Sequence, residues 1–95
     1  MILRFTPAAR NQFLAALAYI QIENPAAALA FRERAEAALR ELERFPDSGR
    51  HIPEFPQLPH RELIVKPYRI FYKVAGSTVW IIGVWHSRRL PEPPH

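Results

Sequence analysis

Apolar residues recur at helical spacing in the first quarter of the chain. The repeating positions are Phe13, Leu17 and Ile20, with Leu14 beside them. This spacing predicts an amphipathic helix over residues 7 to about 22. Thr6 offers a capping hydroxyl, and Pro7 suits the first helical position because its missing N–H would have no helical partner there.

A second helix is predicted from Pro25 to about Arg44, because Asn24-Pro25 repeats the same start signal. Its apolar face consists of Phe31, Ala35, Ala38, Leu42 and Phe45. Only Glu23 and Asn24 separate the two helices, so we expect them to fold back as an antiparallel hairpin. The stretch FPDSG then ends the second helix, since proline, aspartate, serine and glycine favour turns.

Four stretches have the composition of β-strands: ILRFT near the start, then RELIV, RIFYKV and VWIIGVWH. Lys66-Pro67-Tyr68 separates the second stretch from the third, and Ala75-Gly76-Ser77 predicts a tight hairpin before the last. Prolines at 53, 56 and 59 favour an extended, polyproline-like segment that crosses from the helices to the sheet.

The order strand, helix, helix, three strands predicts an α+β fold, in which a helical hairpin packs on one face of an antiparallel meander. The last strand is apolar on both sides, so we place it centrally in the sheet, with Tyr72 and Trp80 in the core. Residues 1–90 are expected to form a single domain, and residues 91–95 a proline-rich tail.

Composition narrows the functional classes. The chain has 95 residues, a hydrophobic fraction of 48% and no cysteine, which indicates a single globular domain without disulfides or thiolate metal sites. No apolar run approaches the roughly 20 residues that span a bilayer, and the start does not resemble a signal peptide. We therefore expect a cytoplasmic protein that makes no use of a membrane.

The positive charge is concentrated in the last third of the chain. Residues 1–59 contain seven arginines and seven acidic residues, whereas residues 60–95 contain six basic residues and only two acidic ones, so this part carries the whole net charge of +4. Such asymmetry favours a polyanion or an acidic protein as partner, although a purely solubilising charge is an equally good interpretation.

The last strand runs directly into His86, Ser87, Arg88 and Arg89. A central strand cannot keep this charged end buried, so it must emerge at the rim of the sheet. Antiparallel pairing predicts that the start of the preceding strand lies at the same rim. The candidate residues for binding a target or a partner are Lys66, Tyr68, Arg69, Trp85, His86, Ser87, Arg88 and Arg89.

These residue types suit two kinds of chemistry. Arginine forks bind phosphate or carboxylate oxygens, and a histidine can move protons near neutral pH. Arg69, His86 and Arg88 are thus the catalytic candidates if the protein cleaves RNA, and otherwise simply bind an acidic surface. Ser87 has no evident partner acid, and the four histidines lack ligand spacing, so neither a nucleophilic serine, a metal nor another cofactor is expected.

The stretches PYRIFYKV and VWIIGVWHSRR, together with the length and the order of elements, resemble the RelE/ParE superfamily of toxins from bacterial type II toxin–antitoxin modules. The resemblance covers essentially the whole chain. It implies a small basic toxin that a cognate antitoxin binds and silences in a hetero-oligomeric complex.

The superfamily divides by target. RelE-like members cut messenger RNA on the ribosome, and Arg69 and Arg88 match their functional arginines, but their paired lysines align with His60 and Glu62. Members of the ParE-like branch inhibit DNA gyrase and commonly end the last strand in a motif like HSRR. The resemblance therefore favours a gyrase-binding toxin. The alternatives are a ribosome-dependent endoribonuclease and a non-toxic nucleic-acid-binding domain.

Overall fold

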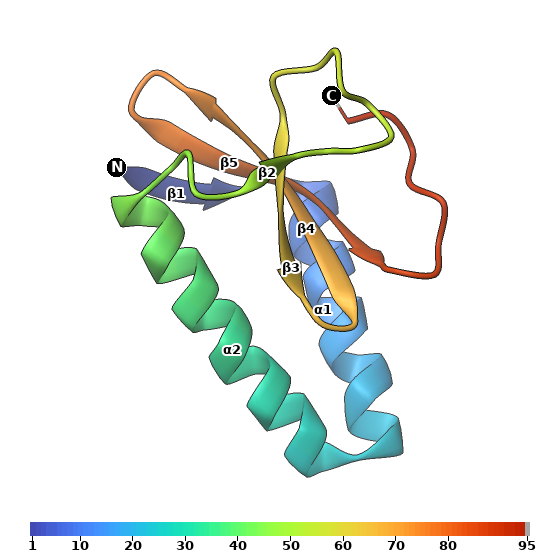
Figure 1. Cartoon of the computed structure of the whole chain (residues 1–95). Coiled ribbons are helices and arrows are strands. Elements are labelled where there is room, and N and C mark those ends of the chain that lie inside the picture. The colour runs from blue at the N-terminus through green and yellow to red at the C-terminus, as the bar shows by residue number, and fades with distance from the viewer. Residues whose placement is uncertain (95) are drawn as a thin grey trace.

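A computed structural model describes residues 1–94 of the chain. A helical hairpin covers one face of a five-stranded sheet (Figure 1), which confirms the predicted α+β architecture. The elements are β1 (Ile2–Phe5), α1 (Pro7–Glu23), α2 (Pro25–Arg44), β2 (Arg50–His51), β3 (Arg61–Val65), β4 (Tyr68–Ala75) and β5 (Thr78–His86).

Both helices begin where the sequence predicts. The Thr6 hydroxyl accepts a hydrogen bond from the Ala9 N–H at 3.2 Å, and Asn24 Oδ1 accepts one from the Ala27 N–H at 3.1 Å. Each cap satisfies a backbone donor that has no partner within its own helix. No helix within residues 1–94 is both long enough and apolar enough to cross a membrane.

The sheet has the strand order β1-β5-β4-β3-β2. The last three strands form the predicted antiparallel meander, and β1 pairs with β5 in parallel. The central position of β5 is therefore confirmed. The two-residue strand β2, which pairs with the start of β3, was not predicted from the sequence. A two-residue turn with Gly76 at φ 62° closes the β4–β5 hairpin, in the left-handed conformation that favours glycine.

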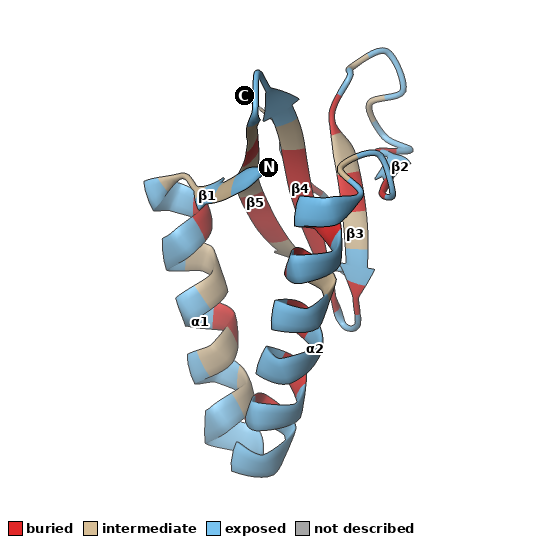
Figure 2. Ribbon diagram, turned by 90° about the vertical axis from the view of Figure 1, so that its left-hand side faces the viewer, coloured by how far each residue is buried: buried red, intermediate tan, exposed pale blue. Residues whose placement is uncertain are grey.

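The core lies between the helices and the sheet, where the buried residues of both layers face each other (Figure 2). Tyr72 is 1% exposed, as predicted for a core residue. Its hydroxyl donates a hydrogen bond to the Pro46 carbonyl at 2.7 Å and accepts one from the Gly49 N–H at 3.0 Å. A side chain at Gly49 would lie 2.6 Å from this hydroxyl, so the close approach requires glycine.

An irregularity between β4 and β5 changes which residues face the helices. Phe71 pairs with Gly83 and Tyr72 pairs with Ile81, which leaves Ile82 between them without a partner. One extra residue on one strand is the mark of a β-bulge, and it interrupts the alternation of faces. Ile81 is in the core, whereas Trp80 lies on the opposite, outer face and is only half-buried. The prediction that Trp80 belongs to the core was therefore wrong.

The segment between β2 and β3 is not the extended crossing that its prolines suggested. Its backbone forms successive tight turns, with hydrogen bonds from the Phe55 N–H to the Ile52 carbonyl and from the Leu58 N–H to the Phe55 carbonyl. Ile52 is fully buried and anchors this loop. Proline fixes only its own φ, which is also compatible with turns.

The proline-rich tail crosses the outer face of the sheet. It contains no helix or strand in its described part, yet Pro91 is buried. Pro93 and Pro94 line a small cavity together with Ile82 and Trp85. His95, the last residue of the predicted tail, lies outside the described residues.

Candidate functional site: a basic rim and a buried arginine

The end of β5 and the turn before β4 lie side by side. Tyr68 pairs with His86, and the Ser87 N–H donates a hydrogen bond to the Pro67 carbonyl at 2.9 Å. The structure thus gathers most of the candidate residues at one end of the sheet. We refer to this group as the basic rim, which consists of Lys66, Tyr68, Trp85, His86, Ser87, Arg88 and Arg89.

His86 organises the turn that carries the two arginines. Its ring lies edge-on to the Tyr68 ring, with the centroids 5.2 Å apart. Its Nδ1 accepts a hydrogen bond from the Arg88 N–H at 3.1 Å, which requires that this nitrogen be unprotonated. Tyr68 is buried, and burial raises the pKa of its hydroxyl. The phenol therefore stays protonated and is a poor candidate for a general base.

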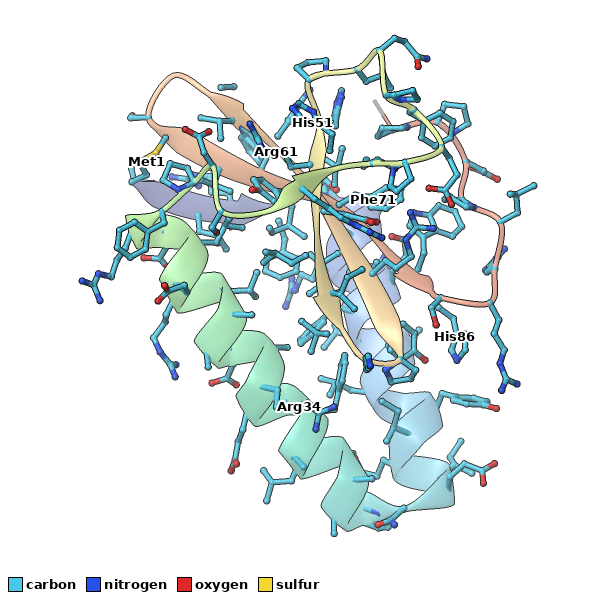
Figure 3. The ribbon with its side chains drawn as sticks, viewed as in Figure 1. Met1, Arg34, His51, Arg61, Phe71 and His86 are labelled. Atoms are coloured by element: carbon cyan, nitrogen blue, oxygen red, sulfur yellow. The ribbon has the colours of Figure 1, made fainter. Side chains whose placement is uncertain are left out.

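The outward side chains of the basic rim are available to a partner. Ser87, Arg88 and Arg89 are exposed, and the Arg89 guanidinium lies 5.2 Å from the centroid of the Trp85 ring. Arg34 of α2 adds a further cation, because its Nη2 donates a hydrogen bond to the Lys66 carbonyl at 2.8 Å. Figure 3 shows Arg34 on the helix near the same end of the sheet as His86. This contribution of α2 was not predicted from the sequence.

A shallow groove runs between α1 and the end of β5. Its volume is about 230 Å³, and its lining includes Gln12, Tyr68, Trp85 and Arg89. Gln12 Oε1 accepts a hydrogen bond from the Val84 N–H at 2.8 Å and so ties α1 to β5 just before the basic rim. An aromatic ring beside arginine in a groove is typical of protein–protein contact sites.

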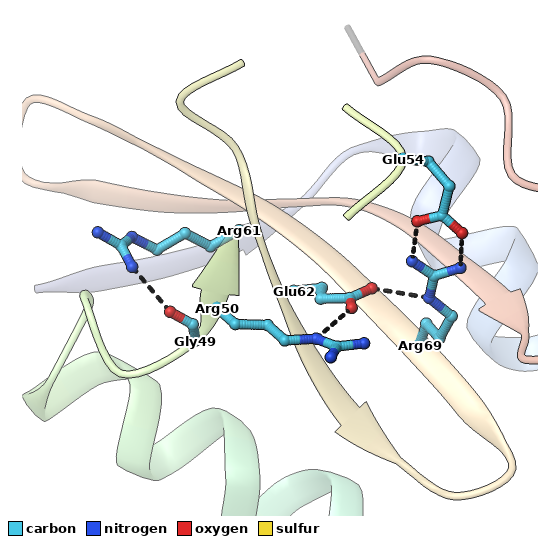
Figure 4. Close-up of polar contacts among 6 residues, drawn as sticks. All are labelled: Gly49, Arg50, Glu54, Arg61, Glu62 and Arg69. Atoms are coloured by element: carbon cyan, nitrogen blue, oxygen red, sulfur yellow. Dashed lines mark hydrogen bonds and ion pairs between the residues drawn. The ribbon is translucent and has the colours of Figure 1, made fainter. Parts of the chain in front are cut away.

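Arg69 is not part of the basic rim, contrary to the prediction. Its side chain points to the outer face, where it is 7% exposed and held by two carboxylates (Figure 4). Nε donates to Glu62 Oε1 at 2.7 Å, and the two terminal nitrogens donate to both oxygens of Glu54 at 2.5 and 2.7 Å. Glu62 also accepts a hydrogen bond from Arg50 Nε at 2.7 Å. The positive charge of Arg69 is therefore neutralised within the molecule.

The titration behaviour of this network follows from its hydrogen bonds. The bond with Glu54, followed by the bond with Glu62, raises the pKa of Arg69 further above its ordinary value. The same bond with Arg69 lowers the pKa of Glu54 from 4.5. Both partners are therefore more firmly charged than they are alone in water. Such an arrangement fixes a loop to a sheet and uses all three nitrogens of the Arg69 guanidinium for bonds within the molecule.

The three residues considered for RNA cleavage do not converge. Tyr68 faces the core, so its neighbour Arg69 faces the outer side of the sheet. His86 pairs directly with Tyr68 and therefore emerges on the side of the helices. His60 and Glu62, which the resemblance aligns with the paired lysines of RelE-like members, are both buried. The structure therefore places the His86 imidazole and the Arg69 guanidinium on opposite faces of the sheet. General acid–base catalysis of RNA cleavage would need both groups at one phosphate.

No group of three or more histidine, aspartate or glutamate side chains within residues 1–94 could hold a metal ion. The fold and the site together define a small basic α+β protein with a cationic surface at one end of its sheet. The chain belongs to the family of ParE toxins of the type II toxin–antitoxin system parDE, whose model matches residues 3–91. The resemblance inferred from the sequence is thus confirmed.

A solved structure supports the same fold. A chain of the chromosomal ParDE toxin–antitoxin system from P. aeruginosa superposes with a TM-score of 0.74 at 19% sequence identity. The match covers 90% of this chain and 95% of that one. At this level of identity the likeness concerns the fold alone. No curated protein sequence gives a significant match.

Proposed function

We propose that this protein is the toxin component of a bacterial type II toxin–antitoxin module, and that it inhibits growth in the cytoplasm by binding DNA gyrase. A cognate antitoxin neutralises it in a toxin–antitoxin hetero-oligomer. Membership of the ParE toxin family over residues 3–91 supports this proposal. The solved ParDE system to which the fold is similar supports a protein partner of this kind.

The observation that carries the proposal is the contrast between Arg69 and the basic rim. The arginine best placed on a rigid strand to bind a phosphate is occupied by Glu54 and Glu62. The exposed cations lie instead around Trp85 and the adjoining groove. Arginine and tryptophan are the residues that most often dominate protein–protein binding, and exposed positive charge accelerates association with an acidic surface. The site favours binding without chemistry.

The first experiment measures whether DNA synthesis or protein synthesis stops first. The chain is induced in bacteria without an antitoxin, and incorporation of labelled thymidine and leucine is followed over the first minutes. We expect DNA synthesis to fall first, and purified protein to inhibit supercoiling by purified gyrase. An earlier fall in leucine incorporation, or normal growth, contradicts the proposal.

A charge-reversal variant tests the basic rim itself. The double variant Arg88→Glu/Arg89→Glu should need an at least ten-fold higher concentration to inhibit supercoiling. Its melting temperature should stay close to that of the unmodified protein. The matched control is Arg10→Glu/Arg40→Glu, which changes the net charge equally on exposed helical positions. An equal loss of inhibition in both double variants would mean that the total charge of the protein, and not the basic rim, determines binding to gyrase.

A further inference from the structure

The segment after the basic rim lies on the outer face of the sheet without being part of the sheet. Pro91 is buried and Pro94 is half-buried, although residues 91–94 belong to no helix or strand. Proline has no N–H group, so Glu92 alone has a backbone donor within this segment. Packing of the proline rings, rather than pairing with a strand, therefore holds the segment in place. We refer to residues 91–94 as the strap.

Two aromatic residues lie beneath the strap on the outer face. Phe71 pairs with Gly83, and Trp85 follows two residues later on β5, so the three positions share one face of the sheet. A cavity of about 140 Å³ is lined by these three residues and, on the side of the strap, by Pro93 and Pro94. Grooves with aromatic walls are common binding sites for proline-rich segments. Both sides of the cavity therefore have the composition of a proline-recognition site.

Gly83 gives this cavity its shape. A Cβ atom at Gly83 would lie 2.8 Å from Trp85 Nε1, so the indole ring occupies the space that a side chain at this position would fill. Glycine offers the ring no side chain to pack against. The position of the half-buried Trp85 ring therefore depends on its other neighbours, and the prolines of the strap are among the residues that line the same cavity.

The strap also fixes the far end of the turn that carries the two exposed arginines. This turn begins where the Ser87 N–H donates a hydrogen bond to the Pro67 carbonyl at 2.9 Å, and the buried Pro91 follows it. Arg89 lies between these two points, with its guanidinium 5.2 Å from the centroid of the Trp85 ring. Trp85 thus lies against Arg89 and also lines the cavity beneath the strap. The place of this cation is therefore linked to the docking of the strap.

We infer that the cavity between Phe71 and Trp85 is a binding site for a proline-rich peptide segment, and that its ligand is the strap of the same chain. Docking of the strap fixes the Trp85 ring, and with it Arg89, in the position that it has on the basic rim. Prolines suit this role because their fixed φ angles leave little conformational freedom to lose on docking. The inference concerns contacts within the chain, so it holds whether or not the protein inhibits gyrase.

The first test uses the unmodified protein in solution. NMR should show nuclear Overhauser cross-peaks between the ring protons of Trp85 and those of Pro93 or Pro94, because these residues line one cavity. The variant Trp85→Phe assigns the indole signals by their loss. Absence of cross-peaks to both prolines overturns the docking of the strap, and this result does not depend on the folding of any strap variant.

The second test removes the proline rings of the strap. The strap variant replaces all three of them by serine: Pro91→Ser/Pro93→Ser/Pro94→Ser. We expect the indole N–H signal of Trp85 to shift, and the ¹⁵N heteronuclear Overhauser effect of the Arg89 amide to fall to that of a chain mobile on the picosecond-to-nanosecond timescale. The matched control replaces three exposed prolines of the loop between β2 and β3: Pro53→Ser/Pro56→Ser/Pro59→Ser. An unchanged Arg89 amide in the strap variant, or an equal change in the control, overturns the role of the strap.

The third test supplies the strap as a separate peptide. The probe is the acetylated peptide Leu-Pro-Glu-Pro-Pro-His, added to the strap variant at about millimolar concentration, which matches the effective concentration that a short linker gives an attached segment. We expect the Trp85 indole signal to return saturably toward its position in the unmodified protein. The control peptide Leu-Ser-Glu-Ser-Ser-His should have no effect. No response to the proline peptide, or an equal response to the serine peptide, overturns the assignment of a proline-binding site.

Discussion

Arg69 on β4 and Arg88 on the turn after β5 lie near the same end of the sheet, but they have opposite environments. Arg69 is 7% exposed and bound by two carboxylates, whereas Arg88 is exposed on the turn after β5. The acidic partner Glu54 comes from a loop that precedes β4 by many residues. The exposed cationic surface is therefore smaller than the excess positive charge of the last third of the sequence suggests. Only arginines without such carboxylate partners are available to another molecule.

The largest effect is expected for Arg69→Ala. Among residues 1–94, removal of the guanidinium leaves the fully buried side chain of Glu62 with the more exposed Arg50 as its one remaining ion-pair partner. Loss of one partner from a buried ion pair costs about 3–5 kcal/mol. Urea denaturation should show this loss, while Arg88→Ala should change the free energy of unfolding by less than about 0.5 kcal/mol. Similar values for the two variants would refute the contrast between a structural and an available arginine.

A second, smaller effect is expected for Tyr72→Phe. The phenol oxygen bonds to both the Pro46 carbonyl and the Gly49 N–H, so its removal leaves two backbone groups of the turn after α2 without this partner. Leaving buried polar groups unsatisfied costs about 1–3 kcal/mol. Thermal unfolding followed by circular dichroism measures the change. Tyr19→Phe, at a side chain that is 61% exposed, is the control and should be neutral.

The pH dependence of stability tests the partner of Arg69. The pKa of Glu54 is lowered from 4.5 in the folded protein. Its contribution to stability is therefore complete above pH 4.5 and disappears as the pH falls through the folded-state pKa. Urea unfolding between about pH 6 and pH 3 should show a shallower acid-induced loss in Glu54→Gln than in the unmodified protein. Parallel pH profiles would mean that Glu54 does not stabilise the fold through its charge.

The smallest effect on stability is expected at the basic rim. Arg88→Glu/Arg89→Glu alters two exposed side chains, and such changes away from packed features usually stay within about 0.5 kcal/mol each. Differential scanning calorimetry should give a melting temperature close to that of the unmodified protein. A large decrease in melting temperature would show that the turn after β5 stabilises the fold. The basic rim would then have a structural role, as Arg69 has.

Much of the fold follows from local features of the sequence. The helix starts at Pro7 and Pro25 are set by adjacent caps and fixed φ angles, and the β4–β5 hairpin is set by Gly76. The central position of β5 follows from its apolar residues on both sides. Each of these signals acts within a few residues, so these features can be predicted from a single sequence.

Trp80 and Arg69 were predicted in the wrong places because their positions are determined by contacts with distant parts of the chain. Trp80 was assigned to the wrong face because the bulge at Ile82 interrupts a strict alternation, and no local signal marks it. Arg69 was placed at the rim because only the folded loop brings Glu54 to it. Part of the candidate site was nevertheless visible, since His86 and the two arginines after it follow directly from the end of a central strand.

The parallel pairing of β1 with β5 has a consequence for how the protein is made. Ile2 pairs with Thr78, so β1 leaves the ribosome long before its partner strand β5 has been made. Closing so long a loop is entropically costly, and the contacts that offset this cost appear only when β5 is complete. The sheet can therefore close only after β5 has been translated, and residues 86–89 follow directly after that strand. A nascent chain has no finished basic rim, and a chain truncated before β5 should be harmless to the cell that translates it.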